Sequence, residues 1–360
     1  MFYIGLVLIL CGLVFMIAAL FRRLEMGLRE WILFSAVLIG GLALACVTVE
    51  PPESWDLYRH YELLEQMQQG GHRYIFTESI YTHLPVVNLL YALVAWIGVP
   101  GLLPCITVIA CYGMLSYMLW DFHKKEKIST QTMMLCFLFN LALCPYFHMV
   151  SGIRNVLAYA FCAFGVYKEH YDKKKYFSIL FSFIAVFIHP SALVILGLCF
   201  LLPIFRKWKL LGIVAVLWSL FAEIMTKILL ALPNAFLQGI GWKLQDYMGN
   251  MEFSNYKILF VKLAFFALLV FLMEAYQKRV SDSQKKYFSL FELTCLVAIG
   301  SFQTPFIADR LCFFIAFTAP PVLSMLHRES RGWLRAVYYA AFCVVVVLLF
   351  LHQVLYFIKS

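Results

Sequence analysis

The sequence predicts an all-α, polytopic integral membrane protein with about 12 transmembrane helices and one short re-entrant or interfacial helix. Hydrophobic residues make up 63% of the 360 residues, and the mean hydropathy is +0.83. Only 14% of the residues are charged, compared with about 25% in soluble domains. One crossing takes roughly 20 apolar residues, so the chain has room for a dozen. These values exclude a soluble globular domain, a disordered chain and a fibrous repeat.

Apolar runs separated by charged residues, proline or glycine give twelve predicted spans, which we treat as one helical domain over residues 1–360. Residues 83–97 are also apolar, but this run is short and bounded by Pro85 and Pro100, so we expect a re-entrant or interfacial segment there. The first span is expected to be a retained helix, because basic residues follow it and none precede it. The twelve spans are 2–21, 31–49, 100–120, 131–149, 153–168, 176–188, 191–205, 210–232, 257–276, 287–304, 311–326 and 335–357.

The basic residues sort to one side of this arrangement. Twenty of the 29 lysines and arginines fall in loops on the same side, which the positive-inside rule assigns to the cytoplasm, with both termini external. A full crossing at 83–97 would place seventeen of these twenty outside. The net charge of +9 is scattered in short clusters, which argues against a nucleic-acid partner. The clusters are Arg22/Arg23/Arg29, Lys124/Lys125/Lys127, Lys168/Lys173/Lys174/Lys175, Arg206/Lys207/Lys209, Lys278/Arg279/Lys285/Lys286 and Arg328/Arg331/Arg335.

Two loops are predicted on the external side, an acidic loop at 50–82 and a second loop at 233–256. In the acidic loop, Leu57, Tyr61 and Leu64 recur at helical spacing, which predicts a short helix lying at the membrane interface. The simpler interpretation of any one carboxylate in this loop is that it is solvated. The second loop contributes Trp242, Lys243, Asp246 and Tyr247.

Three predicted hairpins carry a single ionisable residue at their external mouth: Arg154, His189 and Arg310. Ser151 and Asp309 are expected to be helix N-caps, which would place both arginines in a first turn, where the helix dipole opposes a cation. Asp309 is also a candidate partner for Arg310, whereas Arg154 has no acidic residue within four positions. His189 has the alternative interpretation of a packing histidine.

Arginine binds phosphate oxygens through two parallel hydrogen bonds, and tyrosine offers a ring face and a hydroxyl to a sugar. A carboxylate or an imidazole can accept the proton of an attacking sugar hydroxyl. The sequence has no Gly-rich phosphate loop, no paired Asp-x-Asp and no His/Cys metal cluster, so we expect chemistry without a metal or cofactor. The candidate tyrosines are Tyr58, Tyr61, Tyr74 and Tyr81.

Short motifs on this external side resemble the EpsG family of bacterial exopolysaccharide proteins, which are Wzy-like polymerases. They are DLYRHY, ESIYTHL, GIRN, FIHPSALVIL and ADRLCFF, in the family's order over most of the chain. The sequence departs from the family pattern at Asn155, where Gln usually follows the arginine, at Ser79-Ile80 in place of Pro-Gly, and at Pro190 after the histidine.

The resemblance implies a metal-independent glycosyltransferase that polymerises undecaprenyl-diphosphate-linked oligosaccharide into an exopolysaccharide, capsule or O-antigen chain at the external face of the bacterial cytoplasmic membrane. Flippase and chain-length regulator proteins are candidate partners besides the lipid bilayer. We expect Asp56, Glu78 or His189 to be the catalytic base, with a slight preference for Asp56. The expected substrate-binding residues are Arg154, Arg310, Arg59, Tyr58, Tyr61, Tyr81 and Asn155.

Three alternatives stay open at this point. A glycosyltransferase that adds one sugar from a polyprenyl-phosphate donor would use the same arginines and base. A flippase for the lipid-linked glycan would need charges through the middle of the membrane, whereas here they cluster on one face. A non-catalytic scaffold would be unusual with twelve spans and so few long loops. Within the predicted spans, Glu223 and Lys227 have the i,i+4 spacing at which they neutralise each other. The ionisable residues in spans are Glu223, Lys227, Lys262, Glu274 and Glu292.

Overall fold

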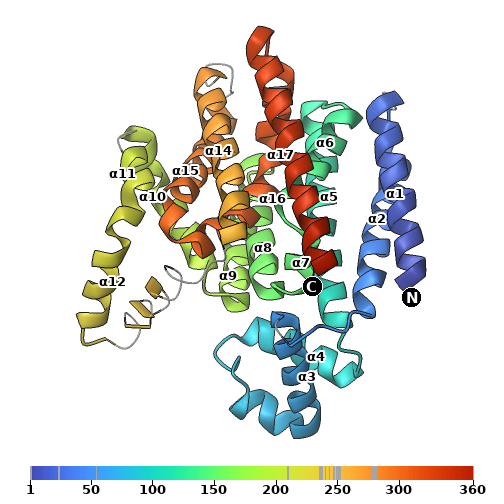
Figure 1. Ribbon diagram of the computed structural model, residues 1–360, viewed down its shortest axis with the longest axis vertical. Coiled ribbons are helices and arrows are strands. Elements are labelled where there is room, and N and C mark those ends of the chain that lie inside the picture. Colours follow the sequence, from blue (N-terminus) through green and yellow to red (C-terminus); the bar gives the residue numbers. More distant parts are fainter. Residues whose placement is uncertain are drawn as a thin grey trace. The chain divides into compact units, whose positions relative to one another are not determined.

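The computed structural model describes residues 2–22, 25–53, 55–208, 211–234, 253–276 and 282–359, with a few single positions between 238 and 248. Every regular element in this part of the chain is a helix (Figure 1), which confirms the all-α class. The chain divides into two compact units, a first unit at Met1–Ile195 and a second unit at Leu196–Ser360. The single domain predicted from the sequence stays a prediction.

The helices follow the predicted apolar runs closely along the chain. Those of the first unit are α1 (Phe2–Arg22), α2 (Leu28–Val47), α3 (Asp56–Arg73), the π-helix η1 (Tyr74–Glu78), α4 (Pro85–Ile97), α5 (Leu102–Glu126), α6 (Thr130–Leu143), α7 (Tyr146–Val150), α8 (Ile153–Tyr171), α9 (Lys175–Ile188) and the start of α10 (Ala192–Lys207). Those of the second unit are α11 (Leu211–Leu217), the 3-10 helix η2 (Trp218–Phe221), α12 (Ala222–Ala231), α14 (Phe253–Tyr276), α15 (Asp282–Gly300), the 3-10 helix η4 (Ser301–Gln303), α16 (Pro305–Glu329) and α17 (Gly332–Lys359).

Six of the described helices are long and apolar enough to cross a bilayer, namely α1, α2, α5, α14, α16 and α17. A seventh span would result if α11 and α12, which meet at an angle of 80°, are counted as one. These helices indicate a membrane protein, but the predicted number of about 12 spans is not confirmed.

The difference between these six helices and the predicted number of about 12 spans has local causes. The predicted span 131–149 is divided at Pro145 into α6 and α7, because proline lacks the N–H that would donate to the carbonyl oxygen of the preceding helical turn. The predicted hairpin 176–205 consists of α9 and α10, which are only 14 and 16 residues long. The short apolar segment predicted at 83–97 forms the 13-residue helix α4, as expected.

In the first unit, α2 packs between α1 and α5. Its contact with α1 has no room for a side chain, because a Cβ at Gly5 would lie 2.8 Å from the carbonyl oxygen of Gly41. Close backbone approach through small residues is the usual way in which helices associate in membranes. On its other side, the Trp31 indole donates a hydrogen bond to the carbonyl oxygen of Ser116 at 3.1 Å.

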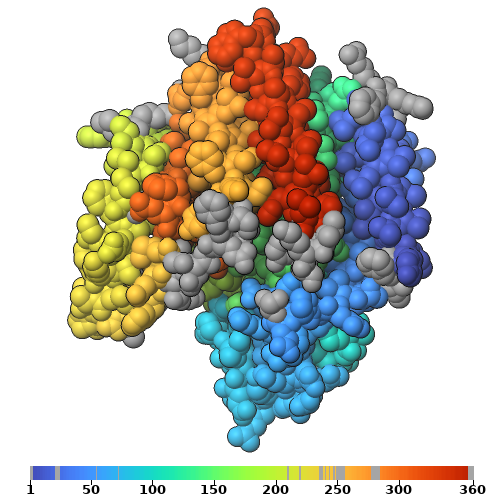
Figure 2. Space-filling view, viewed as in Figure 1, coloured from blue at the N-terminus to red at the C-terminus, as the bar shows by residue number. Residues whose placement is uncertain are grey.

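The helix predicted in the acidic loop is present as α3, which packs against α4 at one end of the first unit (Figure 2). Its interfacial position stays a prediction. Its buried face carries Leu57, Leu64 and Met67. Gly71 has a φ of 61°, a conformation that suits glycine, and the chain then enters the π-helix η1. There the N–H of Ser79 bonds the carbonyl oxygen of Tyr74, five residues back, at 2.8 Å.

Ion pairs join the C-terminal ends of α5 and α8, so these two helices run parallel. Asp172 accepts hydrogen bonds from Lys168 at 2.7 Å and from Lys125, and Lys125 also bonds Asp121 at 2.6 Å. The Lys168 ammonium lies 4.2 Å from the centre of the Tyr117 ring. The start of α8 therefore lies at the opposite end of the first unit from this network.

The second unit is organised around α16, whose residues are almost all buried. It contacts α14 and α15, and the Tyr287 hydroxyl on α15 donates to the carbonyl oxygen of Thr318 at 2.8 Å. An ion pair also links α14 to α16, with 2.5 Å between Lys262 Nζ and Asp309 Oδ1. Both groups are largely buried, so each compensates the charge of the other.

Candidate functional site

Arg154 lies in the first turn of α8 and is half-buried. The helix is capped by Gly152, so the N-cap predicted at Ser151 is wrong by one residue, and Arg154 keeps its predicted position in the first turn. Its guanidinium carbon lies 4.4 Å from the centre of the Tyr81 ring. Within the described part of the chain Arg154 makes no ion pair, although the helix dipole opposes a cation at this position.

The Arg154 side chain packs against a row of buried aromatic rings. Tyr81 meets Tyr91 edge-on at 5.3 Å between ring centres, and Tyr91 meets His60 edge-on at 5.6 Å. We refer to Arg154, Tyr81, Tyr91 and His60 as the Arg154 cluster. Burial raises the pKa of Tyr81, and the charge of Arg154 opposes that rise.

His60 belongs to this cluster, although it is not among the site residues predicted from the sequence. Burial, followed by the positive charges of Arg154 and Arg59, lowers the pKa of His60 to about 3, and a hydrogen bond to the backbone of Ser151 opposes this shift. The imidazole is therefore neutral at pH 7 and adds no second charge beside Arg154. The available signal was its position between Leu57 and Leu64, on the buried stripe of α3.

The two candidate carboxylates near the cluster are exposed and differ in their surroundings. Asp56 begins α3 and forms an ion pair with Arg59 at 3.7 Å, and its charge contributes to the raised pKa of Tyr81. Glu78 ends the π-helix and pairs with Arg73 at 3.5 Å. Asp56 is thus the carboxylate that acts electrostatically on the Arg154 cluster.

His189 caps the C-terminus of α9 and lies next to the start of α8. Its Nδ1 accepts a hydrogen bond from the backbone N–H of Ser191 at 3.1 Å. The Ser191 hydroxyl lies 2.7 Å from the same nitrogen and donates to Oδ1 of Asn155 at 3.4 Å. The structure therefore brings His189 and Asn155 to the same end of α8 as Arg154.

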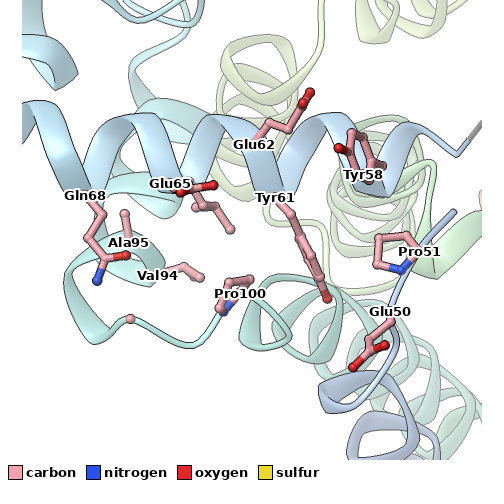
Figure 3. A pocket seen from close by; sticks show the side chains of 12 residues that line it. Glu50, Pro51, Tyr58, Tyr61, Glu62, Glu65, Gln68, Val94, Ala95 and Pro100 are labelled. Carbon is pink, nitrogen blue, oxygen red and sulfur yellow. The ribbon is translucent and has the colours of Figure 1, made fainter. Parts of the chain in front are cut away.

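A cleft of about 470 Å³ opens between α3, α4 and the segment that precedes α3 (Figure 3). Tyr61 extends from α3 into it, toward Pro100 and Glu50, and its buried hydroxyl has no hydrogen-bond partner among the described residues. Burial raises the pKa of Tyr61 to about 12. Within the described lining there is no basic residue. The lining residues that carry polar groups are Glu50, Tyr58, Tyr61, Glu62, Glu65 and Gln68.

The carboxylates give this cleft a negative potential. The charges of Glu62 and then of Glu53 raise the pKa of Tyr58, whose own side chain is solvated. Phosphate groups are disfavoured in such surroundings, whereas the hydroxyl groups of a neutral sugar pair well with carboxylates and tyrosines. The first unit thus places a cationic site and an anionic, tyrosine-lined cleft around the same helix, α3.

Arg310 lies in the second unit, in the second turn of α16. The helix begins at Pro305 with Thr304 as its N-cap, so the N-cap predicted at Asp309 is wrong. Proline is favoured at the first helical position because its missing N–H is not needed there. Asp309 pairs with Lys262 at 2.5 Å. Arg310 itself is half-buried.

Two further sequence-based expectations concern charged residues of the second unit. The i,i+4 pair is confirmed, with 2.7 Å between Lys227 Nζ and Glu223 Oε1. In the predicted external loop, Trp242 is exposed, and Lys243, Asp246 and Tyr247 lie outside the described residues. Among the described residues no three His, Cys, Asp or Glu side chains form a group that could hold a metal ion.

Comparison with known proteins gives one positive finding. A family model described as the EpsG family matches residues 54–359, which include α3, the Arg154 cluster and Arg310. No curated protein and no solved structure matches the chain significantly.

Proposed function

The chain belongs to the EpsG family, and on this premise we propose that it joins lipid-diphosphate-linked oligosaccharide repeat units into a polysaccharide at the external face of the bacterial cytoplasmic membrane. The family suggests a polysaccharide polymerase-like role, and the observation that carries the specific proposal is Arg154. This half-buried cation makes no ion pair in the described part of the chain and lies where the helix dipole opposes it, so an anionic ligand would complete its surroundings.

The proposed ligand of Arg154 is the diphosphate that anchors the growing chain. A guanidinium binds two phosphate oxygens at once. The hydroxyl of the non-reducing sugar on a new lipid-linked unit attacks the anomeric carbon of the growing chain. The bond from that carbon to the phosphate oxygen breaks, and the lipid diphosphate leaves with the bonding electrons. Arg154 neutralises the charge that develops on it, and Arg310 is proposed to share this role.

The base that accepts the proton of the attacking hydroxyl is proposed to be Asp56. It is exposed to substrate, and its charge already acts on Tyr81. Glu78 pairs with Arg73 as Asp56 pairs with Arg59, but the charge of Glu78 is not among those that shift the pKa of Tyr81. His189 has one ring nitrogen bonded to the backbone of Ser191. These two are the alternatives, and Asn155 and Arg59 are proposed as additional contacts to the substrate.

The tyrosine-lined cleft between α3 and α4 is proposed to receive sugar residues of the substrate. Its volume of about 470 Å³ is within the range typical of small-molecule sites. Tyr61 would lend its ring face and its unpartnered hydroxyl to one sugar. The Tyr61→Ala variant should bind the soluble repeat-unit oligosaccharide about 5-fold more weakly, since such an aromatic contact contributes roughly 1 kcal/mol. Tyr176→Ala, at an exposed tyrosine on α9, is the matched control.

The reaction itself is tested with purified protein in lipid vesicles and a radiolabelled lipid-linked repeat unit. A ladder of products that differ by whole repeat units supports the polymerase. Addition of one sugar, dependent on a polyprenyl-phosphate-sugar donor, would identify the one-step glycosyltransferase instead. Movement of the intact unit between leaflets without a new bond would identify a flippase. No turnover and no movement would leave the scaffold alternative.

A further inference from the structure

Asn88 is a buried amide on the otherwise apolar helix α4, and both ends of its side chain are hydrogen-bonded. Nδ2 donates to the carbonyl oxygen of Ile75 at 2.7 Å, and Oδ1 accepts from the Ser79 hydroxyl at 2.9 Å. Both partners belong to the segment that follows α3 and precedes α4. One side chain of α4 therefore holds the π-helix and the residue that follows it.

Ser79 passes this constraint on to Tyr81. The same hydroxyl oxygen that donates to Asn88 accepts the backbone N–H of Tyr81 at 3.2 Å. Ser79 is buried, and its own N–H is bonded to the π-helix. The backbone position of Tyr81 is thus fixed by two hydrogen bonds in series that start at Asn88.

Tyr81 in turn holds Arg154. Its ring lies 4.4 Å from the guanidinium carbon on one side and 5.3 Å from the Tyr91 ring on the other. Tyr91 is three residues after Asn88, so both lie on the same face of α4. A single turn of α4 therefore supplies both Asn88, which binds Ile75 and Ser79, and Tyr91, whose ring packs against Tyr81.

We propose that Asn88 is a positioning residue of the anion site, which fixes Tyr81 so that Arg154 is held ready for a diphosphate. The inference rests on the proposed function, because it needs Arg154 to bind that group. Asn88 does not touch the ligand, and its effect on binding passes entirely through Tyr81 and Arg154. Removing it should leave the guanidinium present but free to adopt orientations that bind less well.

The test measures binding of farnesyl diphosphate to the full chain in detergent micelles by calorimetry. Asn88→Ala should weaken binding about 10-fold, and Arg154→Ala should weaken it more. The double variant should bind no more weakly than Arg154→Ala alone, because Asn88 acts through that arginine. Additive losses, or unchanged binding in Asn88→Ala, would overturn the positioning role.

A matched control separates positioning from general damage to the fold. Asn140→Ala removes another fully buried asparagine of the first unit, on α6, whose amide atoms have no hydrogen-bond partner among the described residues. It should bind farnesyl diphosphate like the wild type. Should Asn88→Ala fail to fold, Ser79→Ala interrupts the same series without altering α4, and it should weaken binding several-fold.

The probe carries no sugar, so the two proposals can fail separately. Suppose that Asn88→Ala weakens binding as expected but the wild-type protein forms no polymer in vesicles. This result would support the positioning role and count against the polymerase. Wild-type protein that does not bind farnesyl diphosphate would overturn both.

Discussion

Helix α8 carries one cation at each end, and the two are held in different ways. Lys168, in the last turn, lies 4.2 Å from the centre of the Tyr117 ring, and Arg154, in the first turn, lies 4.4 Å from the centre of the Tyr81 ring. Lys168 also bonds Asp172 at 2.7 Å, whereas Arg154 makes no ion pair in the described part of the chain. The helix dipole favours Lys168 at the C-terminal end and opposes Arg154 at the N-terminal end.

This difference separates a cation whose charge is compensated within the molecule from one for which we propose an anionic ligand. The charge of Lys168 is compensated within the molecule, so its removal should harm folding and spare chemistry. The charge of Arg154 is costly to the folded chain by about 0.3–1 kcal/mol from the dipole alone, so its removal should spare folding and harm chemistry.

The largest expected effect comes from Arg154→Ala. We expect the rate of polymer formation in vesicles to fall by about 100-fold or more, which is typical when a group that stabilises developing charge is removed. The melting temperature should stay the same or rise. Lys168→Ala is the matched variant and should show the reverse: a lower melting temperature with normal activity per folded molecule. Equal destabilisation by both substitutions would abolish the distinction.

A second prediction concerns the network at the other end of α8. Asp172→Asn takes the carboxylate from Lys168, and we expect the free energy of unfolding to fall by about 2–3 kcal/mol, somewhat less than for a fully buried pair, because the Tyr117 hydroxyl still accepts from that lysine. Denaturant titration in micelles measures this loss. Asp121→Asn leaves both lysines paired with Asp172 and should cost less. A larger loss in Asp121→Asn would contradict this account of the network.

A third prediction uses the pH dependence of the Arg154 cluster. His60 takes up a proton near its ordinary pKa of 6.5 in the unfolded chain but only at a pKa of about 3 in the folded chain. Acidification therefore favours unfolding, by about 2 kcal/mol between roughly pH 7.5 and pH 5. In His60→Leu this acid-induced loss in the free energy of unfolding should disappear. Unfolding free energies that fall equally in the variant and the wild type would show that His60 is protonated in the folded protein.

The smallest expected effect separates the ring of Tyr81 from its hydroxyl. Tyr81→Phe keeps the ring against Arg154 and should bind farnesyl diphosphate like the wild type. Tyr81→Leu removes a cation–π contact of roughly 1 kcal/mol and should bind about 5-fold more weakly. Calorimetry distinguishes the two. Equal losses in both variants would assign the role to the hydroxyl.

The helices could be predicted from the apolar runs. In a bilayer, backbone N–H and C=O groups without hydrogen-bond partners are costly, and a helix satisfies them within one segment. What the runs do not determine is whether one run makes one straight helix. Pro145 divides one predicted span, and the run from 211 to 231 bends by 80°. The predicted number of about 12 crossings is therefore not confirmed, because the pattern records composition but not direction.

The candidate site was predictable only where a residue breaks its local pattern. Arg154 is a cation at a helix start and His189 interrupts an apolar run, and both features are visible in the sequence. His60 and Asn88 are polar residues at buried helical positions, but the sequence alone does not show which partners they contact. Their importance comes from partners brought close by folding, since Arg154 is 94 positions beyond His60. Pro305 was a visible signal for the start of α16 that the choice of Asp309 overlooked.

The π-helix at Tyr74–Glu78 makes the chain length of this segment critical. Its hydrogen-bonded turn contains one residue more than an α-helical turn, so deleting Thr77 would close it as an α-helical turn and shift Ser79 relative to Asn88, its hydrogen-bond acceptor. Surface segments usually accept changes of length, but here an insertion or deletion would act as a point of failure, whereas a substitution at the exposed Phe76 or Thr77 would be tolerated.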